Sequence, residues 1–112
     1  MGKGKIAAQA CHASLKVFLD RAEFSGSGMT IALTDDMRQW LAGPFKKVVV
    51  YVESEAELLE IYRKANDAHL PCSLIQDAGH TVFHGVPTYT TAAVGPAKKE
   101  DLEPITGLLK LL

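Results

Sequence analysis

The feature that most constrains this chain is an unbroken apolar run at residues 48–52, Val-Val-Val-Tyr-Val. Such a run is typical of a strand covered on both faces, because a strand with one wet face alternates apolar and polar residues. A capping-box pair, Ser54 and Glu57, then begins a helix that must end before Pro71. Residues 72–76 are again strand-like. Strand, helix and strand in this order form a crossover unit, which is normally parallel and right-handed, so the sequence predicts an α/β fold.

Shorter elements are expected on either side of this unit. The residue patterns predict a helix over about 5–22, a flexible Ser/Gly loop at 24–28, and a short helix at 37–42 with cap residues among 34–36 and an end at Gly43-Pro44. They also predict a strand at 88–94, a helical turn at 98–102, and a leucine-rich end that docks on the body. Only three strands are evident, fewer than a sheet covered on both faces usually has. We therefore expect a further strand ahead of residue 1.

Composition places the chain among ordinary globular proteins. The 112 residues are 47% hydrophobic and 22% charged, with a formal net charge of −1, and they predict one domain spanning 1–112. A near-neutral chain can contact nucleic acid only through a local patch. No run approaches the length of a membrane span, and Cys11 and Cys72 read as reduced thiols, so we expect a cytoplasmic protein.

The first predicted helix carries a polar stripe. Lys5, Gln9, His12 and Lys16 share one face at helical spacing, and Lys3 precedes them between two glycines. The plain interpretation is a solvated helix face. Two lysines at a helix N-terminus, where the dipole is already positive, also suit an anion such as phosphate. The pattern leaves both interpretations open.

Asp77 follows the second predicted strand directly, in a turn that contains Gly79. Open α/β sheets place ligand-binding and catalytic groups at this position. A carboxylate there could orient a water molecule and accept its proton, aided by nearby hydroxyls: Thr81, Thr88, Thr90 or Thr91. The alternative is that Asp77 only makes an Asx turn.

Metal and thiol chemistry find little support in the sequence. His80 and His84 show no metal-ligand spacing with the cysteines, so we assign no metal. Cys11 and His12 are neighbours on a helix and point about 100° apart, a poor arrangement for a nucleophile and its base. A buried Cys11 beside an exposed His12 is the simpler expectation.

Five separated motifs carry a resemblance to a known family. They are residues 1–9 (Met-Gly-Lys-Gly-Lys-Ile-Ala-Ala-Gln), 12–13 (His-Ala), 76–81 (Gln-Asp-Ala-Gly-His-Thr), 94–96 (Val-Gly-Pro) and 105–112 (Ile-Thr-Gly-Leu-Leu-Lys-Leu-Leu). In this order they resemble type 2 peptidyl-tRNA hydrolases, an archaeal and eukaryotic class with bacterial members. The likeness covers nearly the whole chain.

The resemblance implies a three-layer α/β/α fold around a four-stranded mixed sheet, homodimers, and no metal or organic cofactor. It implies hydrolysis of the ester that joins a peptide to tRNA. Carried over by motif, the catalytic residues are Lys5, Asp77, Thr81 and Thr90, and Gln9 and His12 match substrate-binding residues of the same cleft. Lys3 and Lys16 are added to the substrate-binding residues as candidates for contacts with the tRNA backbone.

This chain departs from the family pattern at four places. The family has a strand ahead of the first motif, and here the motif stands at residue 1. His80 stands where arginine is frequent. Residues 85–90 are one residue longer than the pattern, and the segment between the first helix and Lys46 is also longer.

Together these features predict that Asp77 holds a water with help from Thr81, while Lys5 stabilises negative charge. Lys46 and Lys47 are further candidates for tRNA backbone contacts. Two alternatives remain open: a non-catalytic α/β module that acts through partner proteins, and a hydrolase that depends on Cys11.

Overall fold

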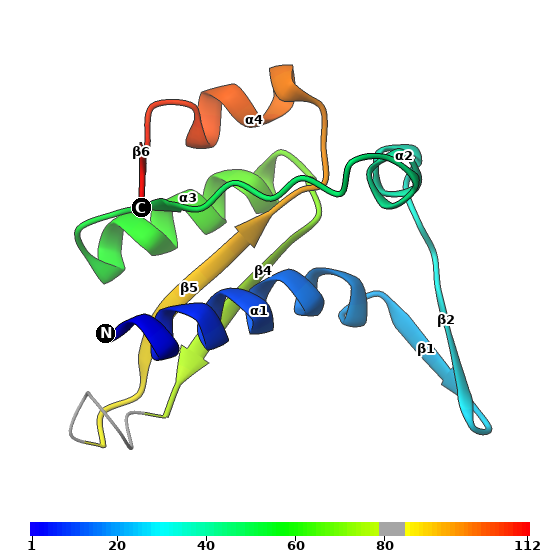
Figure 1. The fold of residues 1–112 in the computed structure, drawn as a ribbon, viewed down its shortest axis with the longest axis horizontal. Helices are drawn as coiled ribbons and strands as arrows, with labels where there is room; N and C mark the ends of the chain where they lie inside the picture. The colour runs from blue at the N-terminus through cyan, green and yellow to red at the C-terminus, as the bar shows by residue number, and fades with distance from the viewer. Residues whose placement is uncertain (79–84) are drawn as a thin grey trace.

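The computed structural model describes residues 1–78 and 85–112 and mixes helices with short antiparallel strands (Figure 1). The elements in chain order are α1 (Lys3–Leu19), β1 (Ala22–Ser25), β2 (Gly28–Ile31), α2 (Asp35–Ala42), β3 (Val50–Tyr51), α3 (Glu55–Asp67), β4 (Cys72–Asp77), β5 (Thr88–Val94), α4 (Lys99–Thr106) and β6 (Lys110–Leu111).

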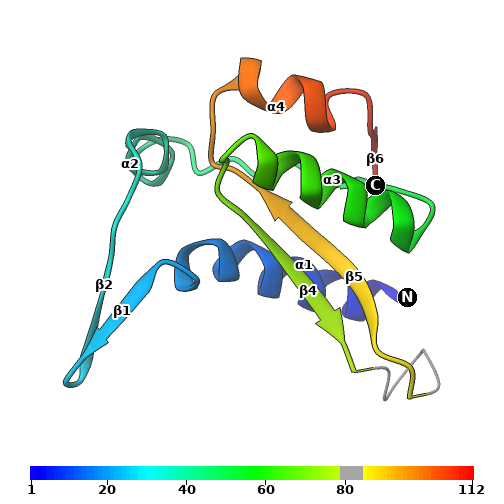
Figure 2. The same cartoon turned by 180° about the vertical axis from the view of Figure 1, so that it is seen from behind.

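The antiparallel pair β4–β5 is the centre of the fold. Helix α1 lies against one face of the pair and α3 against the other, as two opposite views show (Figures 1 and 2). Ala13 and Val17 on α1 and Ala65 on α3 are buried. The hydroxyl of buried Ser73 donates to the carbonyl of Ala13 at 2.7 Å, which fastens α1 to β4. Small side chains at these positions allow the helices to approach closely.

The described strands form three two-stranded antiparallel sheets rather than one mixed sheet. The expected parallel crossover is not among their ladders, since β3 pairs with β6 and β4 pairs with β5. The strand expected over 48–52 is only Val50–Tyr51. Val48 and Val49 are 59% and 49% exposed, so the prediction of burial on both faces is wrong for the chain as described. A strand extends only as far as a neighbouring backbone pairs with it, and within 1–78 and 85–112 the segment that pairs with β3 is the two-residue β6.

The Ser/Gly stretch expected to be a loop is instead the tip of a hairpin, a second correction. Strand β1 pairs with β2 from Ala22↔Ile31 to Ser25↔Gly28, leaving a two-residue turn. Gly26 has φ +59° at the first turn position, as a type II′ turn requires. The hairpin extends away from the helices (Figure 2), and Phe24 near its tip is 76% exposed.

Both side-chain helix caps were predicted correctly. The Thr34 hydroxyl accepts from the Met37 N–H at 3.0 Å, and the Ser54 hydroxyl accepts from the Glu57 N–H at 3.2 Å. These bonds satisfy backbone donors that the first turn of a helix leaves unpaired. Helix α1, expected over 5–22, begins and ends earlier, and its N-cap is Gly2 without a side-chain bond.

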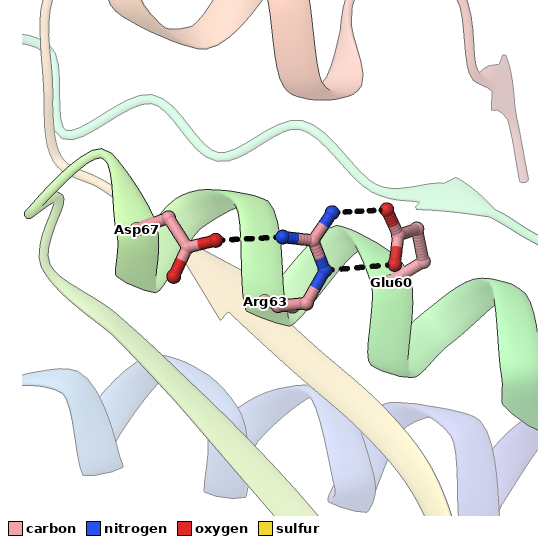
Figure 3. A network of polar contacts seen from close by, with 3 residues as sticks. All are labelled: Glu60, Arg63 and Asp67. Atoms are coloured by element: carbon pink, nitrogen blue, oxygen red, sulfur yellow. Dashed lines mark hydrogen bonds and ion pairs between the residues drawn. The ribbon is translucent and has the colours of Figure 1, made fainter.

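An ion-pair network lines the solvent side of α3 (Figure 3). The Arg63 guanidinium donates from Nε to Glu60 at 2.9 Å and from Nη1 to Asp67 at 2.6 Å. The hydrogen bond from Arg63 lowers the pKa of Glu60 and raises that of Arg63 itself. Exposed pairs of this kind stabilise a helix only slightly.

The C-terminal segment docks through its backbone and through one of its leucines. The Leu112 N–H donates to the Val49 carbonyl at 3.1 Å. Leu109 is half-buried, whereas Leu108, Leu111 and Leu112 are 99%, 72% and 64% exposed. The prediction of docking is therefore confirmed for the main chain and for Leu109, and it is wrong for the other three leucine side chains. Within the described residues, no helix is both long enough and apolar enough to cross a membrane.

Candidate functional site

Lys5 and Asp77 meet where the first turn of α1 passes the end of β4. The Lys5 Nζ forms an ion pair with Asp77 Oδ2, and the two side chains are 23% and 6% exposed. The roles predicted for Lys5 and Asp77 in one reaction require the two groups to lie close together, and this proximity is confirmed. An amine in the first helical turn adds to the positive end of the dipole, and the carboxylate offsets that charge.

Gln9 extends this pair into a chain of polar contacts. Its Nε2 donates to Asp77 Oδ2 at 3.3 Å, and its Oε1 accepts from the Thr90 hydroxyl at 2.9 Å. Gln9 is only 7% exposed. The polar stripe of the first helix thus faces inward at Lys5 and Gln9, contrary to a solvated face. The four side chains join α1, β4 and β5 in one site.

A β-bulge brings Thr90 to this site. The register passes from Ile75↔Thr91 to Gln76↔Tyr89, so Thr90 has no partner on β4. In a regular strand Thr90 would face away from its neighbour Thr91, and an extra residue re-aims the side chain. Thr90 is the last residue of the segment 85–90, which sequence analysis identified as one residue longer than the family pattern.

The remaining predicted binding residues do not join the four-residue cluster. Lys3 and His12 are exposed on α1. The Lys16 amine donates to Asp20 at 2.6 Å, with both side chains over 40% exposed, a surface pair that an anion can displace. Lys3 instead borders a hollow of about 360 Å³ whose other lining residues are Ile6, Ala7, Ala10, Val49 and Leu112.

Thr81, His80 and His84 lie outside the described residues. The Thr88 hydroxyl donates to the carbonyl of Val86 at 3.1 Å, a local turn contact. Cys11 is exposed, so its expected burial is wrong. Across 1–78 and 85–112, no three His, Cys, Asp or Glu side chains gather as metal ligands would.

The arrangement provides the groups that ester hydrolysis needs. A carboxylate at the edge of a buried strand can accept a proton, and an amine beside it can stabilise an oxyanion. The whole chain, residues 1–112, matches the family model described as peptidyl-tRNA hydrolase PTH2.

The chain belongs to the PTH2 family.

Relatives named peptidyl-tRNA hydrolase support this. The chain is 46% identical to the protein of Methanocaldococcus jannaschii over 112 residues, covering 100% of this chain and 90% of the relative. It is 46% identical to that of Methanothermobacter thermautotrophicus, covering 100% and 89%. It is 39% identical to that of Sulfolobus acidocaldarius, covering 100% and 90%.

Sequence reasoning missed one residue that positions the site of this PTH2 chain. Ser73 is 1% exposed and bonds the α1 backbone one turn beyond Gln9. The available signal was a hydroxyl between the apolar residues Cys72 and Leu74 of a predicted strand, because a buried polar group must have a partner.

Proposed function

We propose that this chain hydrolyses the ester bond of peptidyl-tRNA and so releases tRNA for reuse in translation. Family membership and the names of the relatives support the activity. The single observation that supports the assignment of residues is the Lys5–Asp77 ion pair, extended through Gln9 to Thr90. No step of this proposal uses a metal or an organic cofactor.

In the proposed reaction, Asp77 accepts a proton from water as the water oxygen attacks the ester carbonyl carbon. Lys5 moves towards the oxyanion, which weakens its hold on the carboxylate as the carboxylate becomes a base. The bond to the ribose oxygen then breaks, and that oxygen takes the proton. The products are a tRNA with its terminal hydroxyl and a peptide carboxylic acid, which loses its remaining proton to solvent and becomes a carboxylate. Thr81 helps to orient the water, as the resemblance implies.

Gln9 and Thr90 have positioning roles in this scheme. Gln9 donates to the same carboxylate oxygen that Lys5 contacts, so it keeps Asp77 oriented when the amine moves. Lys3, His12 and Lys16 are proposed to bind the RNA backbone from the exposed side of α1.

The test compares purified variants on peptidyl-tRNA, with and without a chelator. Lys5→Ala and Asp77→Asn should each lower kcat by 10²-fold or more, the usual size for an oxyanion group or a general base. Lys98→Ala, an exposed lysine outside the site, is the matched control and should keep full turnover. Circular dichroism checks folding. Unchanged release by both site variants would refute these roles, and RNA binding without any hydrolysis would favour the non-catalytic module.

Finer features of the family resemblance form part of the same proposal. We propose one domain over 1–112, a three-layer fold with a four-stranded mixed sheet, a homodimer and a cytoplasmic location without membrane attachment. Among the described residues β3 pairs with β6 alone, and Val48 and Val49 beside it are exposed, which supports a sheet with one further strand. Light scattering on the purified protein tests the dimer, and a mass of one chain at all concentrations would contradict it.

A further inference from the structure

We propose that the end of α2 and the loop after it form a second RNA contact. Unpaired bases would stack on Phe45 while Lys46 and Lys47 bind neighbouring phosphates. This inference rests on the proposed function, because the RNA concerned is the acceptor end of the tRNA substrate. We call Phe18, Trp40 and Phe45 the aromatic platform.

The aromatic platform is a stack of three rings that ends in an exposed one. The Trp40 ring lies 6.0 Å from that of Phe18, with 21° between the planes. The centroid of the Phe45 ring lies 4.2 Å from that of Trp40, with 28° between the two ring planes. Phe45 is 48% exposed. Single-stranded RNA is commonly bound by stacking its bases on such rings, because every base has a π-face.

The backbone holds Phe45 in place under strain. Its φ is +59°, a left-handed conformation that bulky residues rarely adopt. The Trp40 Nε1–H donates to the Lys46 carbonyl at 2.6 Å, which ties the loop back onto α2. Residues held in such conformations cluster at ligand sites, since the surrounding structure must compensate for the cost. Packing within the protein does not explain why Phe45 is held in this conformation with half of its surface exposed, whereas binding of a ligand to the exposed ring does.

Two lysines follow the exposed ring. The Lys47 Nζ lies 4.5 Å from the Phe45 centroid and 5.8 Å from that of Trp40. Neither Lys46 nor Lys47 forms an ion pair with a carboxylate of the described residues, whereas Lys16 does. An exposed ring beside lysines that have no carboxylate partner among the described residues is the combination that single-strand binding sites use.

The aromatic platform is separate from the site at Asp77. Lys5 is in the first turn of α1 and Phe18 is near its other end, which at 1.5 Å per residue places them about 20 Å apart. The platform would therefore contact nucleotides beyond the one that bears the ester. Its loss should weaken binding of whole peptidyl-tRNA and leave the chemical step intact.

Trp40 is the one tryptophan of the chain, so its fluorescence reports on the platform. Titration with deacylated tRNA should quench its emission. Phe45→Ala should weaken binding at least fivefold, the lower bound for loss of one stacked base. The double variant Lys46→Ala/Lys47→Ala should also weaken binding. It should reduce the steepness of the plot of log affinity against log salt concentration by about 1.4, the value for two lost phosphate contacts on a single strand.

The matched control is Lys98→Ala/Lys99→Ala, which removes the same charge from exposed positions at the start of α4. It should bind tRNA as the parent does. Affinities are also measured by anisotropy of labelled tRNA, because Phe45→Ala alters the Trp40 environment directly. Duplex RNA without unpaired bases should bind less tightly and quench less.

Kinetics separate this inference from the proposed function. With peptidyl-tRNA as substrate, Phe45→Ala and the double variant Lys46→Ala/Lys47→Ala should each raise KM at least fivefold and leave kcat unchanged. Lys5→Ala, by contrast, should lower kcat. Equal tRNA affinity for the parent and all platform variants would overturn the inference, even if hydrolysis is normal. Binding of a protein partner in place of RNA would also overturn it. Absence of hydrolysis with platform-dependent tRNA binding would refute the catalytic proposal alone.

Discussion

Lys5, in the first turn of α1, forms an ion pair with Asp77, the last residue of β4. The two residues lie far apart in the sequence, and each needs the other. Asp77 is almost fully buried, and burying a carboxylate is costly unless it is paired. The helix start carries no acidic side chain in its first turn, so this carboxylate also supplies the charge that the dipole favours.

This pairing predicts coupled effects on stability. Lys5→Met should lower the free energy of unfolding by about 1–3 kcal/mol, because it leaves a buried carboxylate with one partner fewer. Asp77→Asn in the Lys5→Met background should recover part of that loss. Urea unfolding of both single variants and the double variant gives the coupling energy. Effects that add within about 0.3 kcal/mol would show that the pair contributes nothing beyond its separate members.

The hydrogen bonds of Gln9 lead to a second prediction, for both stability and activity. Gln9→Leu keeps the volume but removes the bonds to Asp77 and Thr90, so it should cost about 1–2 kcal/mol of stability. It should also lower kcat, because the carboxylate loses the group that orients it. The control Leu15→Ala lies on the same helix, is 59% exposed, and should change stability by less than about 0.5 kcal/mol. Equal unfolding midpoints for the two variants would contradict the structural role of Gln9.

The sequence predicted much of this site, and its limits have a physical cause. The end of a strand and the start of a helix are recognisable from residue patterns, which made Lys5 and Asp77 separate candidates. Their assignment to one site came from the family resemblance. Helical periodicity places Gln9 on the same stripe as Lys5 but cannot show that the stripe faces inward. That orientation depends on β5 and on the bulge at Thr90, which are long-range features.

The strands predicted at 72–76 and 88–94 are confirmed as β4 and β5, whereas the prediction for 48–52 is wrong over most of its length for a related reason. Residues 48–52 have strong strand propensity, yet only Val50–Tyr51 pairs. Propensity describes fit to a sheet and does not supply a neighbouring strand. At the hairpin, composition alone suggested a loop, whereas Gly26 at the first turn position lets Phe24 and Met29 pair across the strands.

The buried side chain of Met37 is expected to anchor α2. Its side chain is completely buried, whereas Leu41 on the same helix is 43% exposed. Met37→Ala should therefore cost about 2–5 kcal/mol, the usual loss for truncating a buried large side chain. Leu41→Ala, the matched control, should cost clearly less. The measurement is the urea midpoint, and similar values for both variants would show that α2 does not depend on this contact.

The two cysteines predict a difference in reactivity that depends on pH. Burial raises the pKa of Cys72, and the negative charge of Asp20 raises it further. A raised pKa means less thiolate at a given pH, and only the thiolate reacts with an alkylating agent. At pH 7.5, iodoacetamide should therefore modify exposed Cys11 well before Cys72, as followed by mass spectrometry of peptides.

The same argument predicts how the difference in alkylation rate between Cys11 and Cys72 depends on pH. Raising the pH should bring the two rates closer together, because the thiolate fraction of Cys72 continues to grow at higher pH. Asp20→Asn should speed modification of Cys72 at pH 7.5, whereas Asp101→Asn, an exposed aspartate on α4, should not. If Cys72 reacted at the same rate in the parent and in Asp20→Asn, access to the thiol rather than its pKa would control the reaction. Equal rates for both cysteines in the folded protein would contradict the burial of Cys72 itself.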